Sequence, residues 1–412
     1  MKKFEQFIFY FFIVSIPVSL RYIFGYQPFG FAEWKAISIY GTDILFVVLC
    51  VYWIAFGQRF KLGVGDWLLV ALIGAAGMSS LHALDLKVSI YQTLKLTEFV
   101  IFFWYVKYYA SRVFEKEKIY FALVVGAVFQ AVVAIVQFMI QHSLGLKYFG
   151  ESVLSPNMSG IAAFISNGVK IIRAYGTTPH PNVLAAYLIA SIAAYWLVYP
   201  LFKKSWLWHF VYAILLWGLL VTFSRTIIGI GVLFFTVWAF KEFKKYRVLV
   251  ILSLIIGAIF LATYWPYVVN RVTISSADEA ISLRVLYNHE ALAHGVSWFG
   301  IGIGDFVPWL MRQPLPVKSI GLPAEQYQPV HNIYLLIYAE MGLAGLGVFL
   351  AWLIAAAVNF FKQVYISREQ YTYAGLFGVL LLAGLFDHFL WTIQSGQLLF
   401  WLTAGLLSQR NV

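Results

Sequence analysis

Four short polar segments interrupt an otherwise apolar chain, and each carries residue types that can hold phosphate or move a proton. They are RAYGTTPHPN, TFSRT, SLRVLYNHEAL and PVHNIY. Their candidate residues are Arg173, His180, Asn182, Ser224, Arg225, Arg284, Asn288, His331 and Asn332. A guanidinium group matches phosphate oxygens with parallel hydrogen bonds, and histidine exchanges a proton near neutral pH. These types predict a site where arginines stabilise a phosphate or diphosphate leaving group while histidine activates an acceptor hydroxyl.

Each segment also has a plainer structural interpretation. Pro181 and Asn182 suit the start of a helix, and His331 at another helix start can act as a cap. Arg225 can reach the membrane interface from the end of a span. The helix face that carries Arg284 can simply be solvated. The residue types alone leave both interpretations open in every segment.

The elements that position these residues follow from composition. The chain has 412 residues, of which 62% are apolar and 11% charged, with a mean hydropathy of +0.80. A soluble domain is about 25% charged, so this composition excludes soluble, disordered and fibrous proteins. The long continuous apolar runs favour membrane-spanning helices over a β-barrel. We predict an all-α, polytopic membrane bundle, in which the net charge of +11 reflects basic loops.

Twelve apolar stretches approach the roughly 20 residues that a crossing helix needs. We predict spans at approximately 6–24, 37–56, 66–81, 88–109, 119–141, 182–200, 206–223, 226–240, 248–265, 332–360, 372–386 and 395–408. Basic residues cluster in alternate connections, for example at 2–3, 112–118, 203–204 and 241–247. By the positive-inside rule these connections and both termini are cytoplasmic. The four polar segments then face the outer side.

The chain is predicted to form one integral membrane domain, 1–412, with long external loops at about 142–181 and 266–331. Within the second loop, Asp278 to Trp298 has the pattern of an amphipathic helix, with Ser276 or Asp278 as its cap. GIGIGDF, at 300–306, is interpreted as a tight glycine turn rather than a nucleotide loop.

Other polar residues receive structural interpretations. The adjacent Asp387 and His388 are interpreted as coupled to each other or structural. His289 and His294 lack a carboxylate partner at helical spacing, and Cys50 is a single cysteine, so no metal site is expected.

In the order and placement of these segments the chain resembles the superfamily of O-antigen ligases and O-antigen polymerases. The motifs cover about residues 170–350, and the twelve-span layout extends the resemblance over the whole chain. It implies a GT-C-like integral glycosyltransferase of the bacterial plasma (inner) membrane that needs neither metal nor cofactor. Such enzymes take a glycan from undecaprenyl diphosphate on the outer, periplasmic face.

The resemblance also implies roles for the candidate residues. Arg225 and Arg284 are similar to the arginines that hold the diphosphate, with Arg173 assisting. His331 is similar to the residue that orients or deprotonates the acceptor, which implies displacement with inversion. One histidine of the family's HxHN-like pattern is absent, because Pro329 stands in its place.

Several functions stay open on the sequence. A ligase would transfer the glycan to lipid A core or another surface acceptor, and a polymerase would transfer it to another glycan chain by the same chemistry. A protein O-oligosaccharyltransferase is a further possibility. A transporter of lipid-linked glycans would place charges at mid-membrane in broken helices. A non-catalytic scaffold would tolerate substitution of Arg225 or His331.

Overall fold

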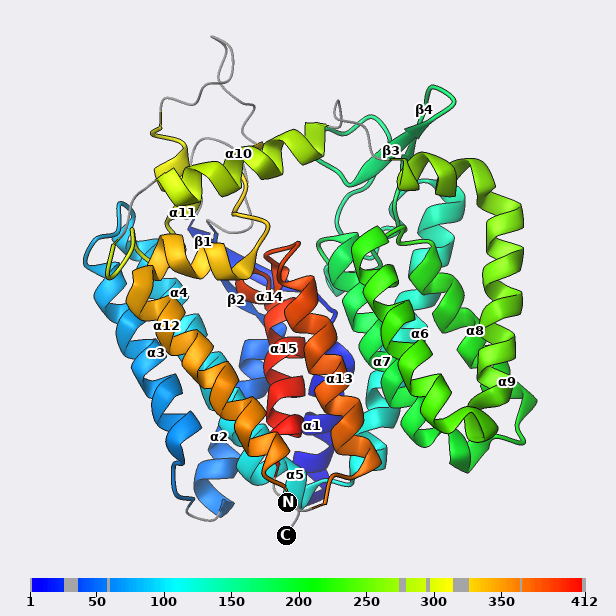
Figure 1. Cartoon of the computed structure of the whole chain (residues 1–412), viewed down its shortest axis with the longest axis horizontal. Helices are drawn as coiled ribbons and strands as arrows, with labels where there is room; N and C mark the ends of the chain where they lie inside the picture. Colours follow the sequence, from blue (N-terminus) through cyan, green and yellow to red (C-terminus); the bar gives the residue numbers. More distant parts are fainter. Residues whose placement is uncertain are drawn as a thin grey trace.

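The computed structural model describes residues 2–25, 36–57, 60–273, 279–293, 297–313, 326–363 and 365–409, and these are mostly helical (Figure 1). The first half contains α1 Lys2–Ser15, β1 Arg21–Gly25, β2 Ile37–Tyr40, α2 Gly41–Phe56, α3 Val64–Ser80, α4 Leu86–Tyr105, the π-helical η2 Val106–Ala110, α5 Ser111–Val113, α6 Lys116–Ile140, the 3-10 turn η3 Lys147–Phe149, β3 Ala163–Ser166, β4 Val169–Ile172 and α7 Pro181–Phe202. The second half contains α8 Trp206–Leu220, α9 Arg225–Val272, α10 Glu279–Ala293, α11 Phe306–Leu310, α12 Ile333–Phe361, α13 Arg368–Ala383, α14 Phe389–Thr392 and α15 Gln394–Leu407.

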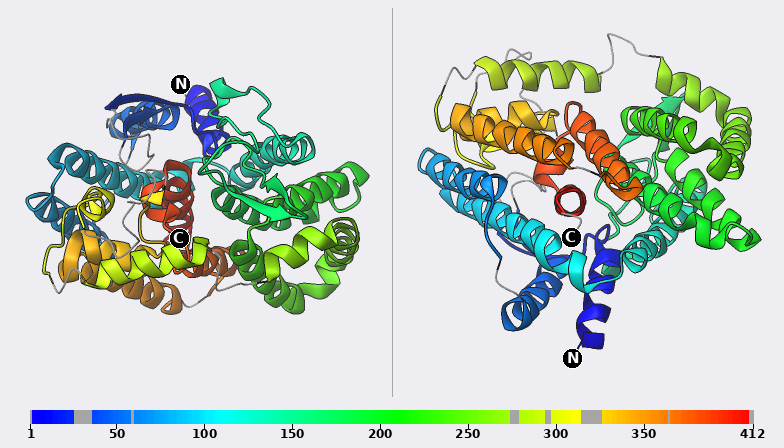
Figure 2. Two further views of the ribbon diagram at one scale, coloured as in Figure 1. Left: turned by 90° about the horizontal axis from the view of Figure 1, so that it is seen from above. Right: turned by 60° about the horizontal axis from the view of Figure 1, so that its bottom comes forward.

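Helix α15 lies at the centre of this arrangement. Every one of its residues is buried, and it packs against α4, α7 and α13 (Figure 2). Apart from Gln394, Ser395, Gln397 and Thr403 its sequence is apolar, and burial along its whole length is the pattern of a helix surrounded by protein. The other helices therefore form a wall around α15 and present their own apolar faces outward.

Helix α9 doubles back on itself. Its backbone leaves helical geometry at Glu242, where φ is −128° and ψ is 33°. At the two ends of the helix, the guanidinium of Arg225 donates a hydrogen bond to the carbonyl of Arg271 at 2.6 Å. A straight helix would separate residues 46 positions apart by about 70 Å. The predicted stretches 226–240 and 248–265 are thus two arms of α9, and both ends of α9 lie together.

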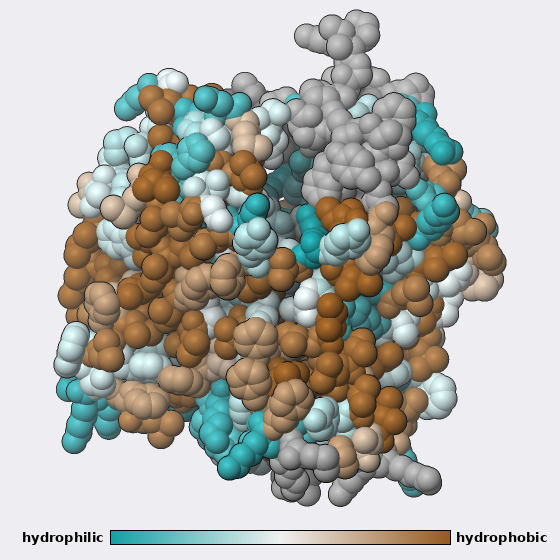
Figure 3. Space-filling view, turned by 180° about the vertical axis from the view of Figure 1, so that it is seen from behind, coloured by the Kyte–Doolittle hydropathy of each residue, from teal (hydrophilic) through white to brown (hydrophobic). Residues whose placement is uncertain are grey.

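Within the described residues, four helices are long and apolar enough to cross a membrane: α6, α7, α9 and α12. The shorter helices α2, α3 and α8 are also apolar. Figure 3 shows a hydrophobic band across the middle of one face, with hydrophilic residues above and below it. The fold is therefore that of a helical membrane protein, while the full set of twelve crossings remains a prediction.

The basic connections gather at one end of the molecule. Both termini and α5 lie at that end, opposite α10 (Figure 1). There, Lys116 pairs with Glu369 at 3.3 Å, and Glu242 lies 3.8 Å from Lys245 and 4.0 Å from Arg368. Connections that the charge pattern assigns to one side thus contact one another.

The GIGIGDF segment fits into a break in α12. Gly342 has a φ of 67°, which only glycine adopts readily, and it interrupts the helix. The amides of Ile301 and Gly302 donate to the carbonyls of Ala339 and Glu340, at 3.1 and 3.0 Å. Gly300, Gly302 and Gly304 all have positive φ. The predicted tight glycine turn is confirmed, and its docking supplies partners for backbone groups that the break leaves open.

The structure corrects the all-α prediction in two places. The predicted first span, 6–24, becomes α1, which ends at Ser15, and a strand at 21–25. The second predicted span starts at 37, where the structure has the antiparallel partner strand, 37–40. Arg21, Tyr22 and Ile39 lie in these strands, and tyrosine and β-branched residues favour a paired strand over a helix. The second hairpin, β3–β4, was also not predicted.

Candidate active site

The β3–β4 hairpin positions the first arginine. Its turn residues, Asn167 and Gly168, both have positive φ, at 51° and 77°. Asn-Gly is the preferred pair for such a tight hairpin turn. The second strand ends at Ile172, and the amide of the next residue, Arg173, donates to the carbonyl of Ala162 at 3.1 Å. The hairpin thereby turns Arg173 inward, where only 7% of its surface is exposed.

Asn182 connects three elements through its side chain. Its Oδ1 accepts hydrogen bonds from Nη2 of Arg173 at 2.7 Å and from Oγ of Ser224 at 2.8 Å. Its Nδ2 donates to Oδ2 of Asp387 at 2.6 Å. Arg173 also donates, through Nε, to the carbonyl of Thr222 at 2.8 Å. The N-terminus of α7, the turn before α9 and the turn after α13 are therefore held in one network.

Arg225 occupies the first position of α9, beside this network. Its guanidinium donates the hydrogen bond to the Arg271 carbonyl, and its side chain is partly exposed. Among the described residues, neither Arg173 nor Arg225 forms a salt bridge with a carboxylate. Their partners are carbonyl and amide oxygens, which orient a guanidinium without cancelling its charge.

The tautomer of His331 follows from its contact. Its Nδ1 lies 3.1 Å from the carbonyl oxygen of Pro329. Because a carbonyl oxygen can only accept, Nδ1 carries the proton and Nε2 keeps its lone pair. Within the described part of the chain, Nε2 has no hydrogen-bond partner. His331 is thus oriented as a proton acceptor.

His180 has the opposite tautomer. It precedes α7, and its Nδ1 accepts the amide hydrogen of Asn182 at 3.2 Å, which caps the helix. Nε2 of His180 therefore carries the proton and can only donate. The helix start predicted at Pro181 is confirmed.

A second histidine supports His331. The ring of His388 meets the ring of His331 edge-on, with centroids 4.9 Å apart. Nδ1 of His388 contacts the Thr392 hydroxyl at 2.6 Å, and the His388 amide donates to Oδ1 of Asp387 at 2.7 Å. Asp387 therefore links the His331–His388 pair to Asn182 and, through it, to Arg173.

Helix α10 lies across this end of the molecule (Figure 1). Its Tyr287 stacks on His331, with centroids 6.1 Å apart and planes 14° apart. Arg284 is close enough for its charge to lower the pKa values of His180, His331 and His388. Oδ1 of Asn288 is buried and, within the described residues, unpartnered. The amphipathic helix predicted at 278–298 is confirmed over 279–293, while its proposed caps at 276 and 278 lie outside the described residues.

Burial controls the charges of these groups. Burial, followed by the charge of the neighbouring His388, lowers the pKa of His331 below its usual range. Burial likewise lowers the pKa values of His180 and His388. Burial and the charge of Arg271 lower the pKa of Arg173, which still remains a cation at neutral pH.

Asp387 behaves differently. Burial alone would raise its pKa, but His388, His331 and His180 and the Asn182 amide outweigh burial and hold the pKa below its usual value. The site therefore combines neutral imidazoles, one carboxylate and several guanidinium groups at neutral pH.

The structure brings together most of the nine candidates from the sequence. Arg173, Asn182 and Ser224 are directly bonded, and His180, Arg225, Arg284 and His331 lie around them. Asn332 is different: its Oδ1 accepts the amides of Tyr334 and Leu335 and caps α12.

Sequence reasoning missed the participation of Asp387, His388 and Tyr287. A polar Asp-His pair in a very apolar C-terminal region was the available indication for the first two. The described residues contain no group of three or more His, Cys, Asp or Glu side chains arranged to hold a metal ion.

The chain was compared with known proteins. No curated protein matches it. Residues 210–350 match the family model described as O-antigen ligase. The matched segment contains Arg225, Arg284 and His331, while Arg173 and Asp387 lie outside it. This match, which covers part of the chain, supports a place in the O-antigen ligase superfamily and a glycan-transfer role in polysaccharide assembly.

Proposed function

We propose that this protein transfers a glycan from undecaprenyl diphosphate to an acceptor hydroxyl on the outer face of the bacterial plasma membrane. The observation that carries the proposal is the presence, in one site, of arginines held by carbonyl and amide oxygens and of a histidine, His331, whose Nε2 keeps its lone pair. The family match supports glycan transfer as the reaction class. An O-antigen ligase type of reaction, on lipid A core or another surface acceptor, is the form that we favour.

The arginines would hold the leaving group. As the bond between the anomeric carbon and the diphosphate oxygen breaks, negative charge builds on the diphosphate. Arg225 and Arg284 would stabilise that charge, with Arg173 fixed behind them by Thr222 and Asn182. Cations already oriented by the protein need no reorganisation during the reaction, which makes their stabilisation of the transition state effective.

His331 would activate the acceptor. The acceptor oxygen attacks the anomeric carbon on the face opposite the diphosphate, and its proton passes to Nε2 of His331. The electron pair of the broken bond leaves with undecaprenyl diphosphate, so the product is inverted at the anomeric carbon. The Pro329 carbonyl holds the imidazole in the tautomer that this step requires. No metal or other cofactor takes part in the proposed step.

The membrane orientation is part of the proposal. The end that carries the termini and the basic connections would face the cytoplasm, by the positive-inside rule. The opposite end, with α10 and the candidate active site, would face the periplasm. The apolar band between them, part of which Figure 3 displays, supports this placement.

The test uses the purified chain in nanodiscs with an undecaprenyl-diphosphate glycan, candidate acceptors and a metal chelator. Release of undecaprenyl diphosphate is followed for the wild type, Arg225→Ala and His331→Ala. Arg312→Ala is the matched control, because Arg312 is exposed just after α11 and makes no contact with the candidate site. We expect release by the wild type and the control and not by the two site variants.

The product then separates the two enzyme types. A single glycan joined to a lipid acceptor indicates a ligase, and a ladder of repeat units indicates a polymerase. If the wild type never cleaves the carrier, or both site variants match it, the enzyme proposal fails. Transport of the lipid-linked glycan across vesicles would then be measured instead.

A further inference from the structure

We propose that Arg271 is a further binding residue for the donor and holds the phosphate that is joined to the lipid chain, an inference that rests on the proposed function. Arg271 lies in the last turn of α9, and Arg225 is the first residue of the same helix. Because α9 doubles back, the guanidinium of Arg225 donates to the Arg271 carbonyl at 2.6 Å. Arginines from the two ends of one helix are thus neighbours beside the candidate active site.

An aromatic cluster positions the Arg271 side chain. Its guanidinium carbon lies 5.8 Å from the centre of the Phe164 ring, which is buried on strand β3. The same ring packs against Phe223, just before α9, with centroids 5.1 Å apart, and against Tyr267, one turn before Arg271, with centroids 5.6 Å apart. A contact with a ring face orients a guanidinium without using its N–H donors. The cluster therefore fixes Arg271 relative to the turn that carries Arg225.

The charges around Arg271 are predominantly positive. Burial, followed by the charge of Arg271, lowers the pKa of Arg173, and the charge of Arg225 lowers this pKa further. Among the described residues, one carboxylate, that of Asp387, acts on Arg173 in the opposite direction. Guanidinium groups that are crowded together repel one another, and a bound polyanion removes that repulsion. A diphosphate, which carries a negative charge on each of its phosphates, has the matching chemistry.

The N-terminus of α9 adds to this positive potential. Ser224 precedes the helix, but its hydroxyl donates to Asn182 at 2.8 Å and does not cap α9. The amides of a first helical turn and the positive end of the helix dipole favour an anion. The arginines and the helix N-terminus therefore attract a negatively charged group to the same place.

The position of Arg271 relative to the histidines indicates which phosphate it binds. The charge of Arg284 lowers the pKa of His331, whereas the charge of Arg271 lowers the pKa of Arg173. Arg284 therefore lies on the histidine side of the site, and Arg271 lies on the other side. Since the acceptor attacks beside His331, the sugar-linked phosphate belongs near Arg284. The lipid-linked phosphate then lies at Arg271.

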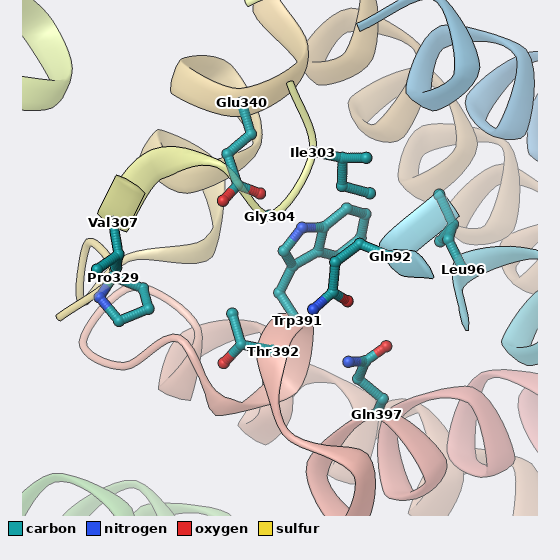
Figure 4. A pocket seen from close by; sticks show the side chains of 10 residues that line it. All are labelled: Gln92, Leu96, Ile303, Gly304, Val307, Pro329, Glu340, Trp391, Thr392 and Gln397. Carbon is teal, nitrogen blue, oxygen red and sulfur yellow. The ribbon is translucent and has the colours of Figure 1, made fainter. Parts of the chain in front are cut away.

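The pocket beside His331 does not offer another place for a phosphate. Pro329, whose carbonyl accepts the Nδ1 proton of His331, and Thr392 line this pocket (Figure 4). Its volume of about 20 Å³ holds roughly one water molecule. The diphosphate must therefore extend away from the histidines, towards Arg271.

The experiment measures lipid binding without turnover. The purified chain in phosphatidylcholine nanodiscs is titrated with undecaprenyl diphosphate and, separately, with undecaprenyl monophosphate, and bound lipid is quantified by native mass spectrometry. Phosphatidylglycerol is then added as a competitor. The variants are Arg271→Gln, Arg271→Lys and Arg284→Gln, and Arg312→Gln is the matched control because Arg312 is exposed just after α11. Circular dichroism and thermal unfolding test whether each variant retains the fold, and Arg271→Lys carries the test if Arg271→Gln does not fold.

We expect Arg271→Gln to bind both lipids about tenfold more weakly, because both carry the lipid-linked phosphate and one charge-assisted hydrogen bond is lost. Arg271→Lys should recover part of this affinity, since lysine restores the charge but not the two-pronged geometry. Arg284→Gln should weaken binding of the diphosphate alone. The control should bind both lipids like the wild type.

Steady-state transfer provides an independent measurement. Arg271→Gln should raise the donor KM about tenfold and change kcat less than about threefold, because Arg271 contacts a phosphate that keeps its charge throughout the reaction. The acceptor KM should not change. A fall in kcat equal to that of Arg225→Ala would contradict this role.

The other outcomes separate this inference from the proposed function. If Arg271→Gln weakens the diphosphate alone, Arg271 binds the sugar-linked phosphate and the assignment is wrong. If phosphatidylglycerol in equal amount displaces undecaprenyl diphosphate, Arg271 binds phospholipid headgroups and the inference fails. If Arg271→Gln binds both lipids like the wild type, and the wild type releases the carrier, Arg271 only stabilises the end of α9 and the enzyme proposal stands. If binding depends on Arg271 but the carrier is never cleaved, the enzyme proposal fails and Arg271 remains a residue that binds the lipid phosphate.

Discussion

The two ends of the molecule treat positive charge differently. At the end with the termini, Lys116 and Arg368 lie against the carboxylates of Glu369 and Glu242. At the opposite end, Arg173 and Arg225 are held by carbonyl and amide oxygens. A paired cation is neutralised, whereas a cation held by dipoles still attracts an anion. Arg173 and Arg225 at the candidate active site thus keep their positive charge available to a ligand, whereas Lys116 and Arg368 at the other end have theirs paired.

The largest effect is expected when the proton acceptor of the candidate active site, His331, is removed. His331→Gln should lower the rate of glycan transfer by about 10²–10⁴-fold, because general base catalysis usually contributes that much. Donor affinity should stay within a few-fold, since the arginines remain. Single-turnover transfer and equilibrium donor binding measure the two effects. An unchanged transfer rate would rule out His331 as the base.

Replacing Arg225 tests directly whether the transfer reaction needs a positive charge at this position. Arg225→Gln should lower the transfer rate by about 10²–10³-fold, the usual effect of losing one group that stabilises transition-state charge. Arg225→Lys should recover part of the rate, because lysine restores the charge but not the two-pronged geometry. Initial rates at saturating acceptor check both variants. Equal rates for glutamine and lysine would mean that charge at this position is irrelevant.

A carboxylate introduced beside Arg173 should pair its positive charge, as the carboxylates at the other end of the molecule do. Asn182→Asp places an anion against Arg173 and also against Asp387, which loses its hydrogen-bond donor. We expect a loss of about 1–3 kcal/mol in the free energy of unfolding, together with slower transfer. Thermal unfolding in detergent and initial rates are the measurements. Asn182→Ala, which removes the network without adding charge, is the control.

The histidine cluster predicts how stability depends on pH. Burial lowers the pKa values of His180, His331 and His388 in the folded chain, whereas an unfolded histidine titrates near about 6.5. Below that pH the unfolded chain binds more protons, so acid should destabilise the fold. The unfolding temperature should fall between pH 7 and pH 5. His331→Gln should flatten this dependence, and an equally steep fall in that variant would contradict the assignment.

The smallest effect is expected at the end that carries the termini. Lys116→Gln should cost less than about 1 kcal/mol in the free energy of unfolding, because both partners of its ion pair are partly exposed. Transfer rates should not change. A loss of transfer comparable to that of Arg225→Gln would show that the two ends do not differ as described.

Local patterns explain why much of the fold was predictable. Apolar runs located the helices, and Pro181 marked the start of α7. Asn167 and Gly168 form an equally local pattern, which is typical of a hairpin turn. The arginines and His331 could be named because polar residues are rare in this chain.

Contacts between distant segments explain what was missed. Asn182 and Asp387 are 205 positions apart, and nothing in either local sequence indicates that they bond. Residue types thus indicate which groups can form a site, but only the fold shows which of them come into contact.

The break in α12 has a consequence for how the protein is made. At Gly342 a Cβ atom would lie 2.4 Å from the carbonyl carbon of Trp298, and the amides of Leu343 and Ala344 donate to Ser297 and Trp298. In hydrocarbon, open backbone groups cost several kcal/mol each. We therefore expect α12 to enter the bilayer as a continuous helix and to bend only when residues 297–302 dock. Biogenesis then has a fixed order, and Gly342→Ala should trap newly inserted chains in a protease-sensitive, straight-helix intermediate.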